Sequence, residues 1–224
     1  MPIIRISNES FESVPMFPLK NVQLFPHTVL PLNIFEPRYL ALVDYALEHD
    51  HLLTIADTSP SQDVIGGSAN ASPVRPILGA GVIVAKHNVA PQRYHILVQG
   101  VTRVILLDEL EQAMPFRQVH AEILLDEEVE ESPLFKLEDQ VRDLVSCFAQ
   151  QRHESAKALY EILNNAPNAE VLSNMLSANI VSAPELRQSL FEELNPYRRL
   201  EMIYQHIGDL LLEASFGTES DLSH

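Results

Sequence analysis

The sequence has little cysteine and no long apolar run, and each absence excludes a class of protein. Its one cysteine, Cys147, excludes an internal disulfide and any metal site built from several thiolates. No stretch approaches the roughly 18 to 20 consecutive apolar residues that cross a bilayer. The apolar segment at the N-terminus is too short for a secretory signal. We therefore expect a cytoplasmic protein without a membrane segment.

Positive charge is also scarce. The chain carries 15 Lys and Arg residues against 31 Asp and Glu, which gives a formal net charge of −16. Residues up to Leu107 are nearly neutral, with 7 basic and 8 acidic side chains, whereas the rest of the chain holds 8 basic and 23 acidic ones. Binding a phosphate backbone depends on clustered Lys and Arg, so the composition argues against nucleic acid as a partner. The asymmetry predicts two structurally distinct parts.

The motifs of common catalytic and cofactor sites are absent from the sequence. It has no G-x-x-x-x-G-K-[ST] loop for a nucleotide phosphate, no G-x-S-x-G serine elbow and no H-E-x-x-H zinc motif. His49-Asp50-His51 is the tightest group among nine histidines, but it lacks a third ligand at a recognisable spacing, so solvated residues at a helix end are expected. Cys147 is expected to be a small packing residue. We predict no catalytic, cofactor-binding or metal-binding residues.

The stretch from Val14 to Tyr39 predicts the order of the first elements. Five prolines interrupt its short apolar runs, which favours short strands and tight turns, because proline lacks the amide that a strand ladder needs. Pro37 suits the first position of a helix, predicted over residues 37–49. The apolar face of this helix follows at helical spacing and consists of Tyr39, Leu40, Val43, Ala46 and Leu47.

Four more strands are predicted before residue 126 from runs of apolar and β-branched residues. These runs are His51–Ala56, Ile77–Lys86, Arg93–Leu107 and Phe116–Leu125. The segment Asp57–Pro76, rich in Ser, Gly, Asn and Pro, predicts a long loop, and His87–Gln92 predicts a turn. Gly100 lies inside the longest run and predicts a bulge or bend.

Helix signals replace strand signals from Asp126 onward. One helix is predicted over Glu154–Leu163, and the others have start signals at Ser132-Pro133, at Asn168, at the capping box Ser182-Ala183-Pro184-Glu185 and at Asn195-Pro196. The predicted fold class is therefore α+β. We expect a β-rich domain over residues 1–127, an all-helical bundle over residues 128–215 and a frayed tail over residues 216–224.

Charged residues flank Pro37 among apolar neighbours, and two interpretations of them stay open. In the structural interpretation, Glu36 caps the exposed amides of the following helix, and Arg38 lies near its first turn. In the functional interpretation, Phe35, Glu36, Arg38 and Tyr39 form part of the rim of a peptide-binding site. Capping is the commoner role for a residue in the position of Glu36.

Several motifs resemble those of a known family. Phe17-Pro18-Leu19, Phe25-Pro26-His27 and Val29-Leu30-Pro31-Leu32 resemble the start of the LON domain, the N-terminal substrate-recognition domain of the ATP-dependent protease Lon. Phe35-Glu36-Pro37-Arg38-Tyr39 is similar to the version in free-standing LON-domain proteins. Later runs resemble the family in the same order, namely Leu78–Val84, Tyr94–Val104, Leu186–Glu192 and Asn195–Leu200. The resemblance covers most of residues 14–210.

The resemblance implies a PUA-like β domain, a pseudo-barrel with one packed helix, followed by a helical bundle. It also implies a module that binds polypeptide substrates or partner proteins through apolar surface. Because the sequence lacks the ATPase and Ser-Lys peptidase motifs of Lon, we expect the module to be non-catalytic. The alternatives are a PUA-like small-molecule or RNA-binding protein, and an enzyme with an unrecognised site. Formation of a homo-oligomer through exposed edge strands is left open.

Overall fold

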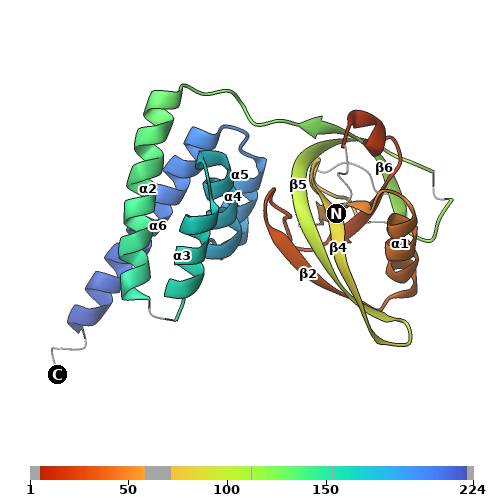
Figure 1. The fold of residues 1–224 in the computed structure, drawn as a ribbon, viewed down its shortest axis with the longest axis horizontal. Coiled ribbons are helices and arrows are strands. Elements are labelled where there is room, and N and C mark those ends of the chain that lie inside the picture. Colours follow the sequence, from red (N-terminus) through yellow and green to blue (C-terminus); the bar gives the residue numbers. More distant parts are fainter. Residues whose placement is uncertain (1–5, 59–71, 112, 153, 221–224) are drawn as a thin grey trace. The chain divides into compact units, whose positions relative to one another are not determined.

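The computed structural model describes residues 6–58, 72–111, 113–152 and 154–220, and it has an α+β fold (Figure 1). The chain divides into two compact units, Met1–Leu125 and Asp126–His224. The first unit holds all the described strands, and the second holds five of the six described α-helices. The α+β class predicted from the sequence is confirmed. No described helix has a stretch long and apolar enough to span a bilayer.

Six strands of the first unit form one mixed sheet. They are β1 (Val14–Leu19), β2 (Val29–Ile34), β3 (Leu52–Asp57), β4 (Ile77–Ala90), β5 (Arg93–Glu109) and β6 (Arg117–Leu124). Their order is β2-β5-β4-β3-β1-β6, and β5 also pairs with β6. This extra pairing closes β5, β4, β3, β1 and β6 into a ring, so β2 pairs with β5 alone among the described strands. The β1–β3 pairing is parallel and the others are antiparallel.

The first helix, α1 (Pro37–Glu48), begins at the predicted residue, with Pro37 in its first turn. Its buried side chains are Leu40, Leu42, Val43 and Ala46, of which Leu42 was not in the predicted face. They belong to an apolar core that also contains Phe17, Leu53 and Ile55 from the strands. Burying a side chain of this size contributes about 1.5–3 kcal/mol. The core therefore fixes α1, and with it the end of β2, against the sheet.

The predicted strands are present, with shifted ends. The predicted turn over His87–Gln92 is shorter, because β4 continues to Ala90 and only two residues separate it from β5. Gln92 has φ near 59° and follows Pro91, whose ring fixes a negative φ, and this combination is typical of a type II turn. The bulge predicted at Gly100 is confirmed, since Gly81 pairs with Gly100 and Ala80 with Thr102. Most of the predicted loop, residues 59–71, lies outside the described residues.

The described part of the second unit contains five helices. They are α2 (Glu131–Gln151), α3 (Ala156–Asn165), α4 (Ala169–Ile180), α5 (Pro184–Glu192) and α6 (Pro196–Ser220). Asn168 caps α4 as predicted, because its side-chain oxygen accepts a hydrogen bond from the Val171 N–H at 3.0 Å. Asn195 caps α6 in the same way, because its side-chain oxygen accepts hydrogen bonds from the Tyr197 and Arg198 N–H groups. The tail predicted over residues 216–224 overlaps the end of α6.

Two predicted helix starts are wrong. Helix α2 begins at Glu131, so Ser132-Pro133 lies inside its first turn, where a proline is tolerated because that amide has no helical partner. Helix α5 has Ala183 at its N-cap, and no side chain caps it. Proline holds the preceding residue in extended backbone, so Pro184 places the N-cap at Ala183 and leaves Ser182 outside the helix.

A buried arginine ties together separate segments of the second unit. Arg199 is fully buried, and its guanidinium binds both carboxylate oxygens of Asp126. It also donates to the Glu193 carbonyl oxygen at 2.8 Å and to the Ser173 hydroxyl at 3.2 Å. These partners come from the start of the unit, from α4 and from the end of α5. The network therefore fixes the start of α6 in the core of the second unit.

Candidate functional site

The junction between β2 and α1 carries the four candidate residues within one short segment (Figure 1). Phe35 and Glu36 connect the two elements, and Arg38 and Tyr39 lie in the first turn of α1. Glu36 has φ −75° and ψ 134°, the extended backbone that a residue before proline prefers. This bend leaves 59% of Phe35 exposed. An apolar ring is therefore presented to solvent next to a charged pair.

Glu36 occupies the N-cap position of α1, but its side chain makes no capping hydrogen bond. Its carboxylate instead accepts hydrogen bonds from Nε and Nη2 of Arg38, at 3.0 and 2.8 Å. Two charged donors on one guanidinium outcompete a single backbone amide. The predicted capping by the Glu36 side chain is therefore wrong. Both side chains are well exposed, so the ion pair contributes at most about 1 kcal/mol to stability.

Tyr39 faces the core rather than solvent. Its ring centre lies 4.1 Å from that of Phe17, with the rings tilted by 54°, and the Arg38 guanidinium carbon lies 4.6 Å from the Tyr39 ring centre. Burial raises the pKa of the Tyr39 phenol, the Arg38 charge lowers it and the Glu36 charge raises it, with a net increase. The phenol is therefore neutral at physiological pH. The four candidates thus comprise an exposed ring, an exposed ion pair and a partly buried anchor.

A second exposed surface lies on β2 and its neighbours. Buried and exposed positions alternate along β2, and Val29, Pro31 and Asn33 are exposed. Pro31 pairs with Leu97 of β5, and Leu97 pairs with Ala85 of β4, so three exposed apolar side chains form a row across three strands. We call this surface the β2–β5 face and define it by Val29, Pro31, Asn33, Ala85, His87, Arg93, His95 and Leu97.

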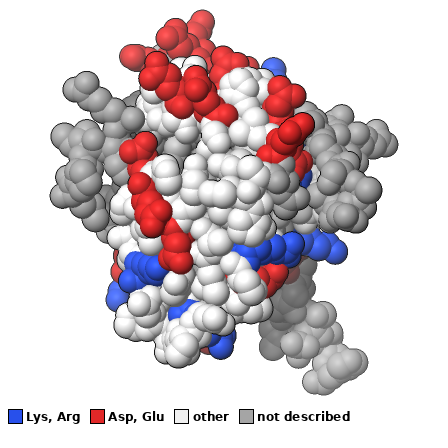
Figure 2. Space-filling view, turned by 90° about the vertical axis from the view of Figure 1, so that its right-hand side faces the viewer, with Lys and Arg blue, Asp and Glu red and all other residues white. Residues whose placement is uncertain are grey.

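The β2–β5 face was not predicted from the sequence, although its strands lie in stretches that lack acidic residues. Residues 14–35 and 77–107 contain no Asp or Glu, in a chain with a net charge of −16. Figure 2 shows an uneven charge distribution on another view of the surface, where acidic side chains lie above and beside a broad uncharged area and basic ones lie below it. Net charge alone therefore does not describe the surfaces that a partner would meet.

The histidine pair near the end of α1 has structural partners. His49 Nδ1 lies 2.8 Å from the Tyr45 carbonyl oxygen, and its ring stacks on the Tyr45 ring at 4.0 Å. His51 Nδ1 lies 3.4 Å from the Ile83 carbonyl oxygen. Across the described ranges, no group of three or more His, Cys, Asp or Glu side chains is arranged to hold a metal ion. The His49 ring therefore packs on the last turns of α1, whereas the His51 ring contacts β4.

Cys147 does not have the packing role that was predicted for it. It is exposed, whereas the buried stripe of α2 consists of Leu137, Val141, Val145, Phe148 and Ala149. The helical periodicity places position 147 beside this stripe and outside it. Leu134 and Leu144 on the same helix are partly buried.

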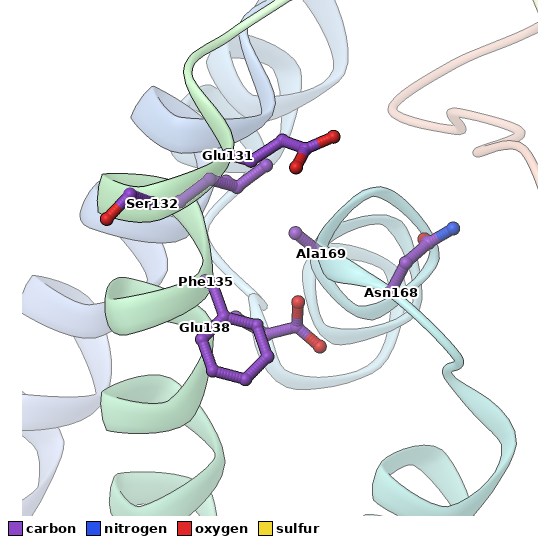
Figure 3. Close-up of a pocket in the computed structure, with 7 residues that line it drawn as sticks. Glu131, Ser132, Phe135, Glu138, Asn168 and Ala169 are labelled. Atoms are coloured by element: carbon purple, nitrogen blue, oxygen red, sulfur yellow. The ribbon is translucent and has the colours of Figure 1, made fainter.

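An open pocket of about 550 Å³ lies in the second unit, between the first turns of α2 and α4 (Figure 3). Figure 3 shows the Glu131 and Glu138 side chains extending from α2 toward α4, while the Ser132 hydroxyl points away from both carboxylates. Glu138 accepts hydrogen bonds from Arg142, and Asn168 caps α4. Two carboxylates disfavour an anionic ligand, and no nucleophile faces a base. The pocket therefore offers no set of catalytic groups.

Comparisons with known proteins point to one family. The family model described as the ATP-dependent protease La (LON) substrate-binding domain matches residues 13–209. The chain is 22% identical over 206 residues to the Lon protease of Anaeromyxobacter dehalogenans, which covers 91% of this chain and 24% of that protein. It is 26% identical over 200 residues to the Lon protease of Syntrophus aciditrophicus, covering 86% and 24%. The chain thus spans about a quarter of the length of these relatives.

Solved structures share the fold. The N-terminal domain of the Mycobacterium avium complex Lon protease matches with a TM-score of 0.68 and 16% identity, over 88% of this chain and 98% of that one. The Lon N-terminal domain protein from Xanthomonas campestris matches with a TM-score of 0.60 and 19% identity, over 85% and 96%. At these identities the similarity shows the fold alone.

Proposed function

Because the chain belongs to the ATP-dependent protease La (LON) substrate-binding domain family, we propose that it recognises polypeptides and catalyses no reaction on them. The proposed partners are polypeptide substrates or partner proteins in the cytoplasm. The comparisons described above give no support to the small-molecule or RNA-binding alternative. The scarcity of Lys and Arg argues further against RNA.

The exposed ring of Phe35 is the observation that carries this proposal. Aromatic side chains that protrude from a rigid scaffold are typical anchors of protein interfaces. Phe35 is held between a paired strand and a helix fixed by its buried face, so little conformational entropy would be lost when a partner covers it. The Glu36–Arg38 ion pair supplies polar groups at the rim, and Tyr39 anchors the turn against Phe17.

The non-catalytic part of the proposal rests on the sequence and on the described side chains. The sequence lacks a phosphate-binding loop and a serine elbow. The residues at the β2–α1 junction comprise one ion pair between exposed side chains and a neutral phenol, and none of them is an activated nucleophile. Purified protein should therefore hydrolyse neither ATP nor casein, and it should need no cofactor.

The finer architecture is also part of the proposal. The ring of five strands supports the assignment of a PUA-like pseudo-barrel to residues 1–127, and the five helices support a bundle over residues 128–215. Because β2 has a single pairing partner, self-association through a sheet edge would use this strand, and Pro31 would remove one hydrogen bond from the new ladder. Light scattering of the purified protein tests for such a homo-oligomer.

The binding function is tested with a fluorescently labelled, permanently unfolded polypeptide and anisotropy titration. The wild-type protein should bind this probe and should not bind the folded, chemically unmodified protein from which the probe was prepared. Replacing Phe35 with Ser should weaken binding about tenfold, a loss of roughly 1.4 kcal/mol. The matched control is Phe135→Ser on α2, which removes a similarly exposed ring, 65% exposed, from the other unit. Equal losses in both variants, or none in Phe35→Ser, would refute a site at the junction.

A further inference from the structure

The β2–β5 face changes its chemistry along the strands. Its first row is apolar and consists of Pro31, Leu97 and Ala85, each paired with the next across β2, β5 and β4. The next exposed row is polar, with Asn33 paired to His95 and His95 paired to His87. One further step of the alternation along β5 reaches the exposed Arg93. A ligand on this face would therefore meet apolar side chains at one end and imidazoles and a guanidinium at the other.

Arg93 differs from the nearby Lys86 and Arg38 because no carboxylate of the described residues binds its guanidinium. Its Nε donates to the Asn33 side-chain oxygen at 3.1 Å, and in the described part of the chain no carboxylate contacts it. In contrast, Lys86 lies 2.7 Å from Asp44 and over the ring of Tyr94. Arg38 is likewise held by Glu36. A guanidinium bonded only to a neutral amide retains donors for a carboxylate.

We propose that the β2–β5 face selects polypeptide segments in which apolar side chains lie next to Asp or Glu. The apolar side chains cover Val29, Pro31 and Leu97, and a carboxylate binds Arg93. The exposed fractions of Val29 and Leu97 are 54% and 40%, so both have area to bury. This inference rests on the proposed function and adds the class of segment that is bound.

The edge of β2 is not the contact surface in this proposal. Pro31 lies in the middle of β2 and has no N–H to donate, so an added strand would lose a ladder hydrogen bond at its centre. A partner that covers the side chains of the face avoids this loss. RNA fits the face poorly, because one unpaired guanidinium is too little for a phosphate backbone.

The test compares two labelled peptides of equal length, one with apolar residues and Glu, the other with the same apolar residues and Lys. The general attraction of a protein with net charge −16 favours the Lys peptide. The proposal predicts the opposite order, with the Glu peptide bound about tenfold more tightly in anisotropy titrations at low salt. Arg93→Glu should abolish this preference, Arg93→Gln should reduce it, and Leu97→Asp should weaken binding of the Glu peptide.

The matched control is Arg198→Glu on α6, which makes the same charge change at an exposed position of the other unit and should leave the preference intact. Thermal melts of each variant establish that it is folded. Three outcomes would overturn the inference: equal binding of both peptides, a preference for the Lys peptide, or a preference for the Glu peptide that survives in Arg93→Glu. The proposed function would still stand in these cases if the unfolded probe binds. Displacement of the Glu peptide by an RNA oligonucleotide would also overturn the inference. Failure of every peptide and of the unfolded probe would overturn both proposals.

Discussion

Gly100 packs directly against the carbonyl oxygen of Phe25, so closely that a Cβ at position 100 would lie 2.1 Å from this oxygen. The Gly100 N–H donates to the Thr28 carbonyl oxygen at 2.8 Å, and the His27 N–H donates to the Gly100 carbonyl oxygen at 2.9 Å. The turn before β2 is thus fixed to β5 through a residue without a side chain. The position of β2, and of the face it carries, depends on this contact.

Replacing Gly100 with Ala should destabilise the protein by at least about 2 kcal/mol. The new methyl group meets the backbone of Phe25 rather than a flexible side chain, so the turn before β2 must move away from β5 to make room. Chemical denaturation measures the loss. Gly208→Ala in α6 is the matched control, because a Cβ there has no neighbour within 4 Å and alanine is the better helix former, with an expected gain of about 0.5–1 kcal/mol. Equal stability of Gly100→Ala and wild type would contradict the close contact.

The two helix starts at Glu36 and Asn168 should respond differently to alanine. Asn168 accepts a hydrogen bond from the Val171 N–H, so Asn168→Ala should cost about 1 kcal/mol. Glu36 makes no such bond and only an exposed ion pair, so Glu36→Ala should cost less than about 0.5 kcal/mol. Denaturant unfolding of both variants checks the difference. A cost near 1 kcal/mol for Glu36→Ala would restore the capping interpretation.

Local signals allowed the sequence to predict much of the fold. Pro37 fixes the start of α1 because proline removes an amide that the first turn does not use, and Asn168 caps α4 with its own side chain. The wrong predictions also concern helix starts, namely the side-chain cap at Glu36 and the first residues of α2 and α5. In each case two hydrogen-bond donors, or two neighbouring N-cap positions, compete. Glu36 had a guanidinium two residues away as well as backbone amides, and the spacing alone does not decide between them.

Features that depend on pairing could not be predicted. The parallel pairing of β1 with β3 and the closure of β5 onto β6 join segments far apart in the chain. The β2–β5 face becomes visible only when the register places Pro31 opposite Leu97. The candidate residues Phe35, Glu36, Arg38 and Tyr39 share one segment, so the sequence could group them, and their role in binding stays a prediction.

Removing one partner of the buried ion pair in the second unit should be costly. Arg199 is fully buried, so Asp126→Ala leaves a guanidinium with an uncompensated charge, at a cost of about 3–5 kcal/mol. The exposed pair Lys157–Glu161 is the matched control, and Glu161→Ala should cost no more than about 0.5 kcal/mol. Denaturant unfolding measures both losses. The double variant Asp126→Leu with Arg199→Met should be more stable than Asp126→Ala, and the opposite order would refute the charge explanation.

Tyr39 should make the protein lose stability at alkaline pH. Burial raises the pKa of its phenol above the ordinary value of 10.0, so the folded protein keeps a proton that the unfolded chain releases. The unfolded state therefore binds fewer protons than the folded state as the pH rises above about 10, and the free energy of unfolding falls.

Lys86 changes the free energy of unfolding in the same direction. Burial alone would lower its pKa, but the hydrogen bond and charge of Asp44 outweigh burial and raise it above 10.5.

The measurement compares the free energy of unfolding at about pH 8 and about pH 10.5, on either side of the ordinary phenol pKa. Wild type should lose stability between these values, and Tyr39→Phe should lose less, because its ring packs on Phe17 without an ionisable group. The double variant Tyr39→Phe with Lys86→Met should lose least, since Lys86 no longer contributes. The contradicting outcome is a free energy of unfolding that falls by the same amount in Tyr39→Phe and in wild type. The phenol would then ionise as freely in the folded protein as in the unfolded chain, and the anchoring role of Tyr39 would be wrong.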